Sequence, residues 1–291
     1  MNKVIVITGP TGIGKTRLSI TIAKHFNGEI INADSMQIYK GLDIGTAKIS
    51  ESEKEGIPHH LFDIREIEDD YSVYDYQRDG RLILDNLNTK KIPIIVGGTG
   101  LYIKALLYNY SFNKENQKYD FSHLTNEQLY DELKKYNNGI DIHINNRQRL
   151  ERYLNKYMNN NTIVNDRDEL LYDTIFIGLT TDRDTLYNII NKRVDKMIAN
   201  GLIDEVKAIY DRGIRSKSIM TGIGYKELYQ YFDGEISLED AISIIKQNSR
   251  RYAKRQYTWF NHQMKIKWFD VKLNNFEETE AEIISYIEKN L

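Results

Sequence analysis

The feature that most restricts how this chain folds is a glycine-rich stretch close to its start. Residues 9–16 are GPTGIGKT, which matches the pattern G-x-x-x-x-G-K-[ST]. An apolar run rich in β-branched residues, KVIVIT at 3–8, precedes the stretch, and helical spacing at 15–26 follows it. A glycine-rich turn between a strand and a helix points its backbone N–H groups at phosphate oxygens, next to the positive end of the helix dipole. The sequence therefore predicts a binding site for a di- or triphosphate.

The rest of the chain continues this alternation of strands and helices. We expect strands at 29–32, 92–96, 174–179 and 265–269, and helices at 71–88, 100–107, 183–200, 202–211, 238–260 and 277–289. Such alternation indicates a parallel sheet that is covered by helices. The predicted fold class is therefore α/β, with a P-loop NTPase-like parallel sheet core flanked by helices.

One segment breaks the pattern. Residues 111–172 are rich in Asn, Tyr, Lys and Asp, and they show weak helical spacing without a clear strand. We interpret 111–172 as a smaller, all-helical insertion domain. The catalytic core is then discontinuous and consists of 1–110 and 173–291.

The composition narrows the class of protein. None of the 291 residues is a cysteine, which excludes disulfides, thiolate zinc sites and cysteine nucleophiles. No apolar run approaches the stretch of about 20 residues that spans a bilayer, and the first residues form no signal peptide. We therefore expect a cytoplasmic protein without membrane contact. The formal net charge of −2 argues against a general nucleic-acid coater.

The positive charges are nevertheless concentrated in two places. Residues 241–269 lack acidic residues but contain Lys246, Arg250, Arg251, Lys254, Arg255, Lys265 and Lys267. Helical spacing places on one face Arg251, Lys254, Arg255 and Thr258. The second cluster is Arg147, Arg149, Arg152 and Lys156. Such patches attract polyanions, although a solvated helix face remains an alternative explanation.

The residue types around the glycine-rich stretch favour group transfer. Lys15 supplies a positive charge to bound phosphates, and the Thr16 hydroxyl can bind Mg²⁺. P-loop NTPases usually add an aspartate from a second strand, but the strand at 92–96 ends in Gly-Gly-Thr. The one acid placed beside the loop is Asp34, after the strand at 29–32. Three ligands stay open: a nucleotide to be hydrolysed, a nucleotide that donates phosphate, or a leaving diphosphate. Hydrolysis, as in a motor or a switch protein, fits a single acid least well.

Several longer stretches carry a family resemblance. They are NADSMQIYKGLDIGTAK at 32–48, PHHLFDI at 58–64, IIVGGTGLYIKALL at 94–107, INNRQRLER at 144–152, KRVDKMIANGLIDEV at 192–206, GIGYKEL at 222–228 and AKRQYTWF at 253–260. Together with GPTGIGKT, they resemble the tRNA dimethylallyltransferase (tRNA isopentenyltransferase) family, in the family's order and over nearly the whole chain. A P-loop occurs in many unrelated proteins, whereas DSMQIY, DIGTAK and GGTGLY together are specific.

The resemblance implies a reaction. The dimethylallyl group would pass from dimethylallyl diphosphate to N6 of the adenosine 3′-adjacent to the anticodon, at position 37 of tRNA, with release of diphosphate. The loop would then grip the diphosphate, with Mg²⁺ as cofactor, through Gly9, Pro10, Thr11, Gly12, Ile13, Gly14, Lys15 and Thr16. The motif taken alone would instead suggest a nucleotide such as ATP.

The family's catalytic positions correspond to Asp34, Thr99 and Arg193. Asp34 would accept the proton from the exocyclic amine, a contribution on the order of 10²–10⁴ in rate. Thr99 would contact substrate, and Arg193 would hold two oxygens of the diphosphate. Each residue has a structural alternative. In these alternatives, Asp34 would cap a turn or lie in the magnesium shell, Thr99 would cap the helix at 100–107, and Arg193 would be an exposed helix residue.

The family's tRNA contacts correspond to three segments. They are Asp34, Ser35, Met36 and Gln37, then Gln148, Arg149, Leu150, Glu151 and Arg152, then Thr221, Gly222, Ile223, Gly224, Tyr225 and Lys226. The target base would leave its stack, at a cost of a few kcal/mol, and Ser35 and Gln37 would read its edge. We expect the anticodon stem-loop to be held between core and insertion, and the protein to act as a monomer.

Two other functions stay open. The first is a P-loop small-molecule kinase that uses ATP, which would need further cationic residues and would leave 241–269 without a role. The second is an RNA-binding nucleotide switch, which the missing acid after 92–96 disfavours. We assign the adjacent His59 and His60 to structure, because the sequence places no ligand cluster beside them.

Overall fold

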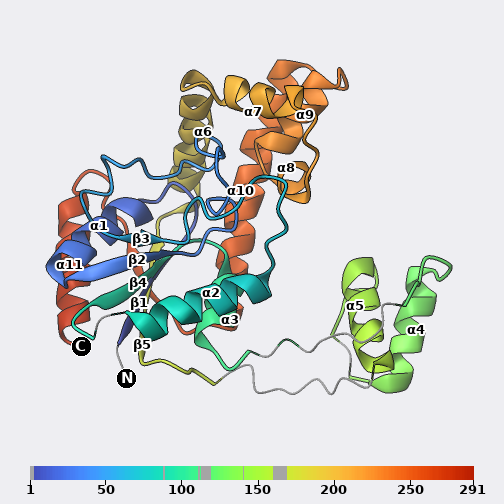
Figure 1. Cartoon of the computed structure of the whole chain (residues 1–291), viewed down its shortest axis with the longest axis horizontal. Helices are drawn as coiled ribbons and strands as arrows, with labels where there is room; N and C mark the ends of the chain where they lie inside the picture. Colours follow the sequence, from blue (N-terminus) through green and yellow to red (C-terminus); the bar gives the residue numbers. More distant parts are fainter. Residues whose placement is uncertain (1–2, 88, 111, 113–118, 140, 160–168) are drawn as a thin grey trace. The chain divides into compact units, whose positions relative to one another are not determined.

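The computed structural model describes residues 3–87, 89–110, 112, 119–139, 141–159 and 169–291. The chain divides into two compact units. We call Met1–Tyr108 with Leu170–Leu291 the core unit, and Asn109–Glu169 the insertion unit. Figure 1 shows the helices and strands of each unit, coloured along the sequence. The bounds expected from the sequence differ slightly from this division.

The core unit is built on a six-stranded parallel sheet in the order β3-β2-β4-β1-β5-β6. The strands are β1 (Val4–Thr8), β2 (Gly28–Asn32), β3 (His59–His60), β4 (Ile92–Val96), β5 (Thr174–Thr180) and β6 (Lys267–Asp270). The predicted parallel α/β fold is confirmed, and every strand expected from the sequence is present. The sequence does not predict β3, because two residues are too few to show a pattern.

Both faces of the sheet are covered, and β1 shows how. Successive side chains of a strand point to opposite faces. Val4 and Val6 belong to one buried cluster, whereas Ile5 and Ile7 belong to another. The first cluster contains side chains of α2 (Val73–Asn86) and α3 (Gly100–Leu107), and the second contains side chains of α1 (Lys15–His25) and α11 (Phe276–Glu288). A strand that is buried on both faces needs apolar residues throughout, which explains the continuous apolar run at the start of the chain.

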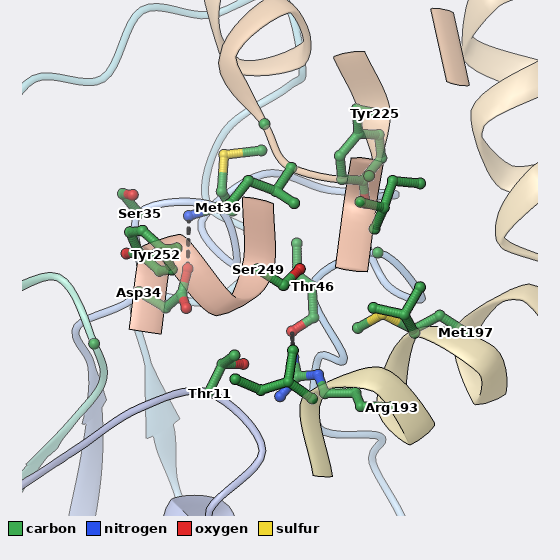
Figure 2. Close-up of a pocket in the computed structure, with 18 of the residues that line it drawn as sticks. Thr11, Asp34, Ser35, Met36, Thr46, Arg193, Met197, Tyr225, Ser249 and Tyr252 are labelled. Carbon is green, nitrogen blue, oxygen red and sulfur yellow. Dashed lines mark hydrogen bonds between the residues drawn. The ribbon is translucent and has the colours of Figure 1, made fainter. Parts of the chain in front are cut away.

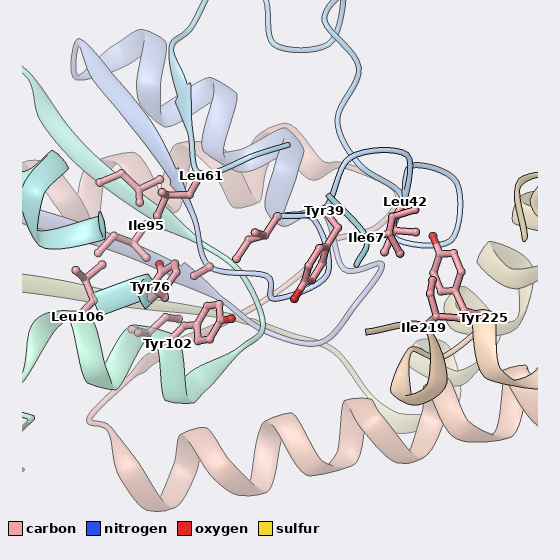
Figure 3. Close-up of a cluster of buried hydrophobic side chains, with 14 of the residues drawn as sticks. Tyr39, Leu42, Leu61, Ile67, Tyr76, Ile95, Tyr102, Leu106, Ile219 and Tyr225 are labelled. Atoms are coloured by element: carbon pink, nitrogen blue, oxygen red, sulfur yellow. The ribbon is translucent and has the colours of Figure 1, made fainter. Parts of the chain in front are cut away.

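Tyrosine rings form part of the first cluster (Figure 3). Tyr76 of α2 stacks on Tyr102 of α3, with ring centroids 4.1 Å apart. Tyr39, from the loop after β2, and Tyr225, from the C-terminal half, are buried in the same cluster. The cluster therefore ties the loop after β2 to the helices that follow β5.

The chain after β5 is mainly helical. The helices between β5 and β6 are α6 (Arg183–Ala199), α7 (Leu202–Asp211), α8 (Lys217–Thr221), α9 (Tyr225–Phe232) and α10 (Leu238–Gln263). Gly201, with φ 97°, separates α6 from α7, as its place in the sequence predicts. The sequence pattern does not predict α8 and α9, which are short and are stabilised by burial of residues such as Leu228. None of the helices in the described ranges combines the length and apolarity needed to cross a membrane.

The described part of the insertion unit is helical, as predicted, with α4 (Asn126–Tyr136) and α5 (Arg147–Met158). Its core consists of Phe121, Leu129, Leu133, Ile142, Leu150 and Leu154. Arg147, a member of the predicted basic cluster, donates hydrogen bonds of 2.8 Å to the carbonyl oxygens of Phe121 and Leu124. Its guanidinium therefore serves the fold of the insertion rather than a basic surface.

Candidate active site

Three loops meet at the carboxyl edge of the sheet, where proteins with parallel α/β sheets bind ligands. They follow β1, β2 and β4. The N–H of Gly97 donates to the carbonyl oxygen of Ile7 at 3.2 Å, and that of Thr99 donates to Ala33 at 3.0 Å. A Cβ on Gly97 would lie 2.2 Å from the carbonyl carbon of Ala33. Only glycine permits this approach, which brings the loop after β4 against the loop after β2.

The loop after β1 has the backbone expected of a phosphate-binding loop. Positive φ angles of 140°, 83° and 101° occur at Gly9, Gly12 and Gly14. These values lie in a region that residues with a Cβ rarely adopt. Lys15 turns back over the loop, and its Nζ donates to the carbonyl oxygens of Gly9 at 3.0 Å and Pro10 at 2.7 Å.

Lys15 also dominates the electrostatics of the loop. Burial, together with the positive charge of Arg193, lowers the pKa of Lys15 to about 7, against the opposing effect of Asp34. A bound anion would favour the ammonium form, because a nearby negative charge raises the pKa of an amine. The loop is therefore suited to an anionic ligand.

Asp34 follows β2 and has a defined orientation. Its Oδ1 accepts a hydrogen bond from the N–H of Met36 at 2.9 Å, and its own N–H donates to Oδ1 of Asn32 at 2.8 Å. The turn-capping role considered from the sequence is thus present. Capping and chemistry do not exclude one another, since the Asp34 side chain lines two hollows at the sheet edge.

Thr99 precedes α3, but its side chain does not cap that helix. Its Oγ1 instead accepts a hydrogen bond from the N–H of Ser35 at 3.1 Å. Tyr252 and Gln256, from α10, line the helix hollow beside this loop, and Gln256 donates from its Nε2 to the carbonyl oxygen of Gly98 at 3.0 Å. Burial, followed by the charge of Asp34, raises the pKa of Tyr252 to about 12, so the phenol keeps its proton at neutral pH. The loop after β4 therefore contacts both the loop after β2 and α10.

Arg193 projects from α6 to the same place. Its Nη2 donates to the carbonyl oxygen of Thr46 at 3.1 Å. Burial lowers the pKa of Arg193, and the charge of Asp34 opposes that shift. The alternative of an exposed helix arginine is wrong, because the side chain is partly buried and lines both hollows.

The two hollows meet at these residues. The loop hollow, of about 250 Å³, adds the polar residues Thr16, Ser19 and Gln37. The helix hollow, of about 310 Å³ and drawn in Figure 2, adds the apolar residues Met36, Val194, Met197, Leu202, Ile223 and Ile245. Residues common to both are Thr11, Lys15, Asp34, Thr46 and Arg193. A ligand with an anionic end and an apolar part would therefore fit across the junction.

Two of the predicted tRNA segments lie in the core unit and line the helix hollow. Residues 34–36 and 221–226 are among its walls, and a Cβ on Gly222 would meet Cε of Met36 at 2.7 Å. Tyr225 is buried, and its hydroxyl donates to Glu205 at 2.8 Å, so this residue also supports the structure. Gln37 faces the loop hollow and donates from Nε2 to the carbonyl oxygen of Thr46 at 3.1 Å.

The third segment lies on α5 of the insertion unit. Gln148, Arg149 and Arg152 are exposed, while Glu151 is partly exposed and pairs with Arg147 at 2.7 Å. Leu150 is fully buried in the core of the insertion. The Leu150 side chain packs inward, as expected of an apolar residue at a helix interface, so the exposed side chains of this segment are the ones placed to meet tRNA.

The described residues offer oxygen ligands for Mg²⁺ without forming a complete cage. Within the described ranges, no group of three or more His, Cys, Asp or Glu side chains is placed to hold a metal ion. Mg²⁺ commonly binds one or two carboxylates, substrate phosphates and several waters. Thr16 and Asp34 both line the loop hollow, so the residues present fit an ion that is held mainly by a ligand's phosphates.

The positive charges that the sequence concentrates at 241–269 form two groups on α10. Lys246 pairs with Asp195 at 2.5 Å, and Arg250 donates to Asn191 at 2.6 Å, so these two cations pack against α6. The four residues predicted to share one face of α10 are all exposed: Arg251, Lys254, Arg255 and Thr258. Arg255 also lines the helix hollow, which connects this surface to the site.

Sequence reasoning missed several residues of the site. Tyr252 and Ser249 of α10 line the helix hollow, while His59 and Phe62 line the loop hollow. His59 also has a structural contact, because its Nδ1 lies 2.7 Å from the carbonyl oxygen of Ile57, and burial lowers its pKa. No spacing in the sequence signals that Tyr252 and Ser249 of α10 face the site, since the residues opposite them lie far away along the chain.

Known proteins match this chain over almost its full length. A family described as IPP transferase matches residues 37–263. The tRNA dimethylallyltransferase of Anoxybacillus flavithermus is 48% identical, covering 98% of this chain and 96% of that protein. The enzyme of the same name from Bacillus subtilis is 47% identical, covering 92% of this chain and 90% of that protein.

Solved structures agree with these matches. A tRNA delta(2)-isopentenylpyrophosphate transferase from Staphylococcus epidermidis is 42% identical, with a TM-score of 0.77 and 100% of both chains covered. A eukaryotic dimethylallyltransferase acting on tRNA is 30% identical, with a TM-score of 0.85, covering 100% of this chain and 79% of that chain. Fold, site and matches lead to one conclusion: the chain belongs to the IPP transferase family.

Proposed function

We propose that this protein is a tRNA dimethylallyltransferase that uses dimethylallyl diphosphate and modifies N6 of adenosine 37, next to the anticodon. The observation that carries the proposal is the junction of the loop hollow and the helix hollow at Lys15, Asp34 and Arg193. Cations at this junction suit the diphosphate, and the apolar wall of the helix hollow suits the carbon chain and a base.

The reaction exchanges one bond for another. The C–O bond between the allylic carbon and diphosphate breaks, and its electron pair leaves with the diphosphate. The N6 lone pair forms the new C–N bond, and the proton lost from N6 passes to the carboxylate of Asp34. An exocyclic amine is a very weak acid before it is alkylated, so this proton transfer comes late and Asp34 first orients the amine.

Charge develops on the departing diphosphate, and three kinds of group in this chain oppose it. They are the backbone N–H groups of the loop after β1, the ammonium of Lys15 and the guanidinium of Arg193. Preorganised donors of this kind stabilise a leaving group because they need little rearrangement as the bond breaks. Mg²⁺, held in part by Thr16, would neutralise further charge on the phosphates.

The acceptor base would enter the helix hollow between the two core segments. Gln37 lies in the wall of the adjoining loop hollow and donates from its Nε2 to Thr46, so its Oε1 would accept a hydrogen bond from the edge of the base that reaches the junction of the two hollows. Exposed cations on α10, with Arg149 and Arg152 on the insertion, would bind the phosphates of the anticodon stem-loop. The monomeric state and the cytoplasmic location stay predictions.

A direct assay tests this function. Purified protein is incubated with labelled dimethylallyl diphosphate and tRNA from a strain that lacks the modification, with and without Mg²⁺. We expect labelled tRNA and diphosphate in equal amounts, and no label in transcripts that carry guanosine at position 37. Release of phosphate from ATP, or phosphorylation of a metabolite, with tRNA left unlabelled would refute the proposal. The kinase alternative is not favoured, because the relatives that match this chain carry the name of the transferase.

A further inference from the structure

Glu205 binds a loop rather than a partner side chain of opposite charge. It lies in the first turn of α7. Its carboxylate accepts hydrogen bonds from three consecutive backbone N–H groups, at 3.0 Å from Asp43, 2.7 Å from Ile44 and 3.0 Å from Gly45. Successive N–H groups that converge in this way form an anion-binding nest, and here a carboxylate of the chain itself occupies the nest. Hydrogen bonds to an ionised acceptor are about twice as strong as neutral ones.

The hydroxyl of Tyr225 completes the arrangement. It donates to Oε1 of Glu205 at 2.8 Å, while its ring packs on Gly45. A Cβ on Gly45 would lie 2.6 Å from the ring, so this approach requires glycine. Glu205 thus joins the loop at 43–45 to the start of α9, one of the segments predicted to meet tRNA.

The bound loop leads directly into the active site. Thr46 is the next residue, and its carbonyl oxygen accepts hydrogen bonds of 3.1 Å from Nη2 of Arg193 and 3.1 Å from Nε2 of Gln37. Arg193 lines both hollows and Gln37 lines the loop hollow, so the two donors meet at the junction where the diphosphate and the base would come together. The place of a single carbonyl group therefore fixes two side chains that must meet different substrates, and Figure 2 shows Thr46 and Arg193 at this contact.

We propose that Glu205 is a positioning residue for the transfer reaction: it holds the loop at 43–46 so that the Thr46 carbonyl aligns Arg193 with the diphosphate and Gln37 with the base. The kinetic test of this proposal rests on the function proposed above, because it measures transfer to tRNA. A misplacement of about 1 Å far from the chemistry can cost on the order of 10²-fold in rate, because the two reactants must be aligned for attack. Glu205 itself does not line either hollow.

The chain offers a matched control. Asp204 lies in the same first turn of α7 and carries the same charge, but its side chain is exposed. Asp204→Asn and Glu205→Gln therefore remove equal charge from the same helix end, and only the second disturbs the nest. A glutamine presents one acceptor oxygen where the carboxylate presents two, so it cannot satisfy all four donors.

The first measurement is the binding of inorganic diphosphate by calorimetry, which needs no tRNA. We expect Glu205→Gln to weaken diphosphate binding, and to lower kcat/KM for transfer on the order of 10- to 100-fold. Asp204→Asn should stay within about twofold of the wild type in both assays. Wild-type behaviour of Glu205→Gln in both assays would overturn the proposal. If Glu205→Gln does not fold, Tyr225→Phe removes one donor and should shift both quantities in the same direction.

The second measurement separates positioning from stability. If Glu205 acts through Arg193, Glu205→Gln should change diphosphate affinity less than about threefold in an Arg193→Lys background, because the relay is already broken. Equal effects in the two backgrounds, with a lowered melting temperature, would mean a purely structural role and would overturn the proposal. A wild-type protein without transferase activity would refute the proposed function, and the diphosphate titration would still decide whether Glu205 positions Arg193.

Discussion

Replacement of Asp34 by asparagine separates the two roles of this side chain. Oδ1 of Asp34 accepts the Met36 N–H at 2.9 Å, and the amide oxygen of asparagine can accept the same hydrogen bond. The turn after β2 should therefore persist, while the charge that takes the proton from N6 is removed. General-base catalysis contributes about 10²–10⁴ in rate, which corresponds to roughly 2.7–5.4 kcal/mol of the barrier. Single-turnover transfer should slow by that factor.

Asp34→Ala provides the comparison. It removes the same charge and also the hydrogen bond that caps the turn, whose net contribution is about 0.5–1.5 kcal/mol. We expect both variants to lose transfer to a similar extent, and the alanine variant alone to lose stability against urea. Filter binding should give both variants nearly the tRNA affinity of the wild type. Transfer by Asp34→Asn within about tenfold of the wild type would refute the assignment of Asp34 as base.

Three further predictions follow from the geometry. The pKa of Lys15 is about 7 in the folded protein, against a usual 10.5. Between pH 7 and pH 10, Lys15 is therefore protonated in the unfolded chain but largely neutral in the folded protein. The free energy of unfolding of the wild type, measured in urea, should therefore rise from pH 7 to pH 10 relative to Lys15→Met, by at most about 1.4 kcal/mol per pH unit. Gly97→Ala should lower the free energy of unfolding by at least about 1–3 kcal/mol, because the new Cβ would meet backbone atoms at 2.2 Å. Gly139→Ala should leave it nearly unchanged in the same urea measurement, because the nearest atom lies at 3.5 Å. Neutralising the exposed Arg251 and Lys254 should reduce the slope of log affinity for tRNA against log salt by about 0.7–0.9 for each tRNA phosphate that these side chains bind, and an unchanged slope would exclude them from the interface.

Local patterns predicted the elements whose signals are contained in a few neighbouring residues. The run at 3–8 and the glycines that follow it predict a strand and a phosphate loop, and both are present. The sequence also placed Asp34 beside that loop. Side-chain partners were less predictable. Thr99 has the sequence position of a helix cap, yet its hydroxyl accepts from Ser35, because the loop after β4 packs against the loop after β2.

The sequence by itself determined the alternation of strands and helices along the chain, the anion-binding loop and the family. Those properties depend on backbone conformation and on residue spacing within a short stretch. Only the tertiary structure decided that Glu205 would occupy a nest of amides at 43–45, that Gln256 would donate to the carbonyl oxygen of Gly98, and that Leu150 would face inward. Such interactions join residues far apart in the chain, and their energies arise when packing removes water from both partners, which no local pattern records.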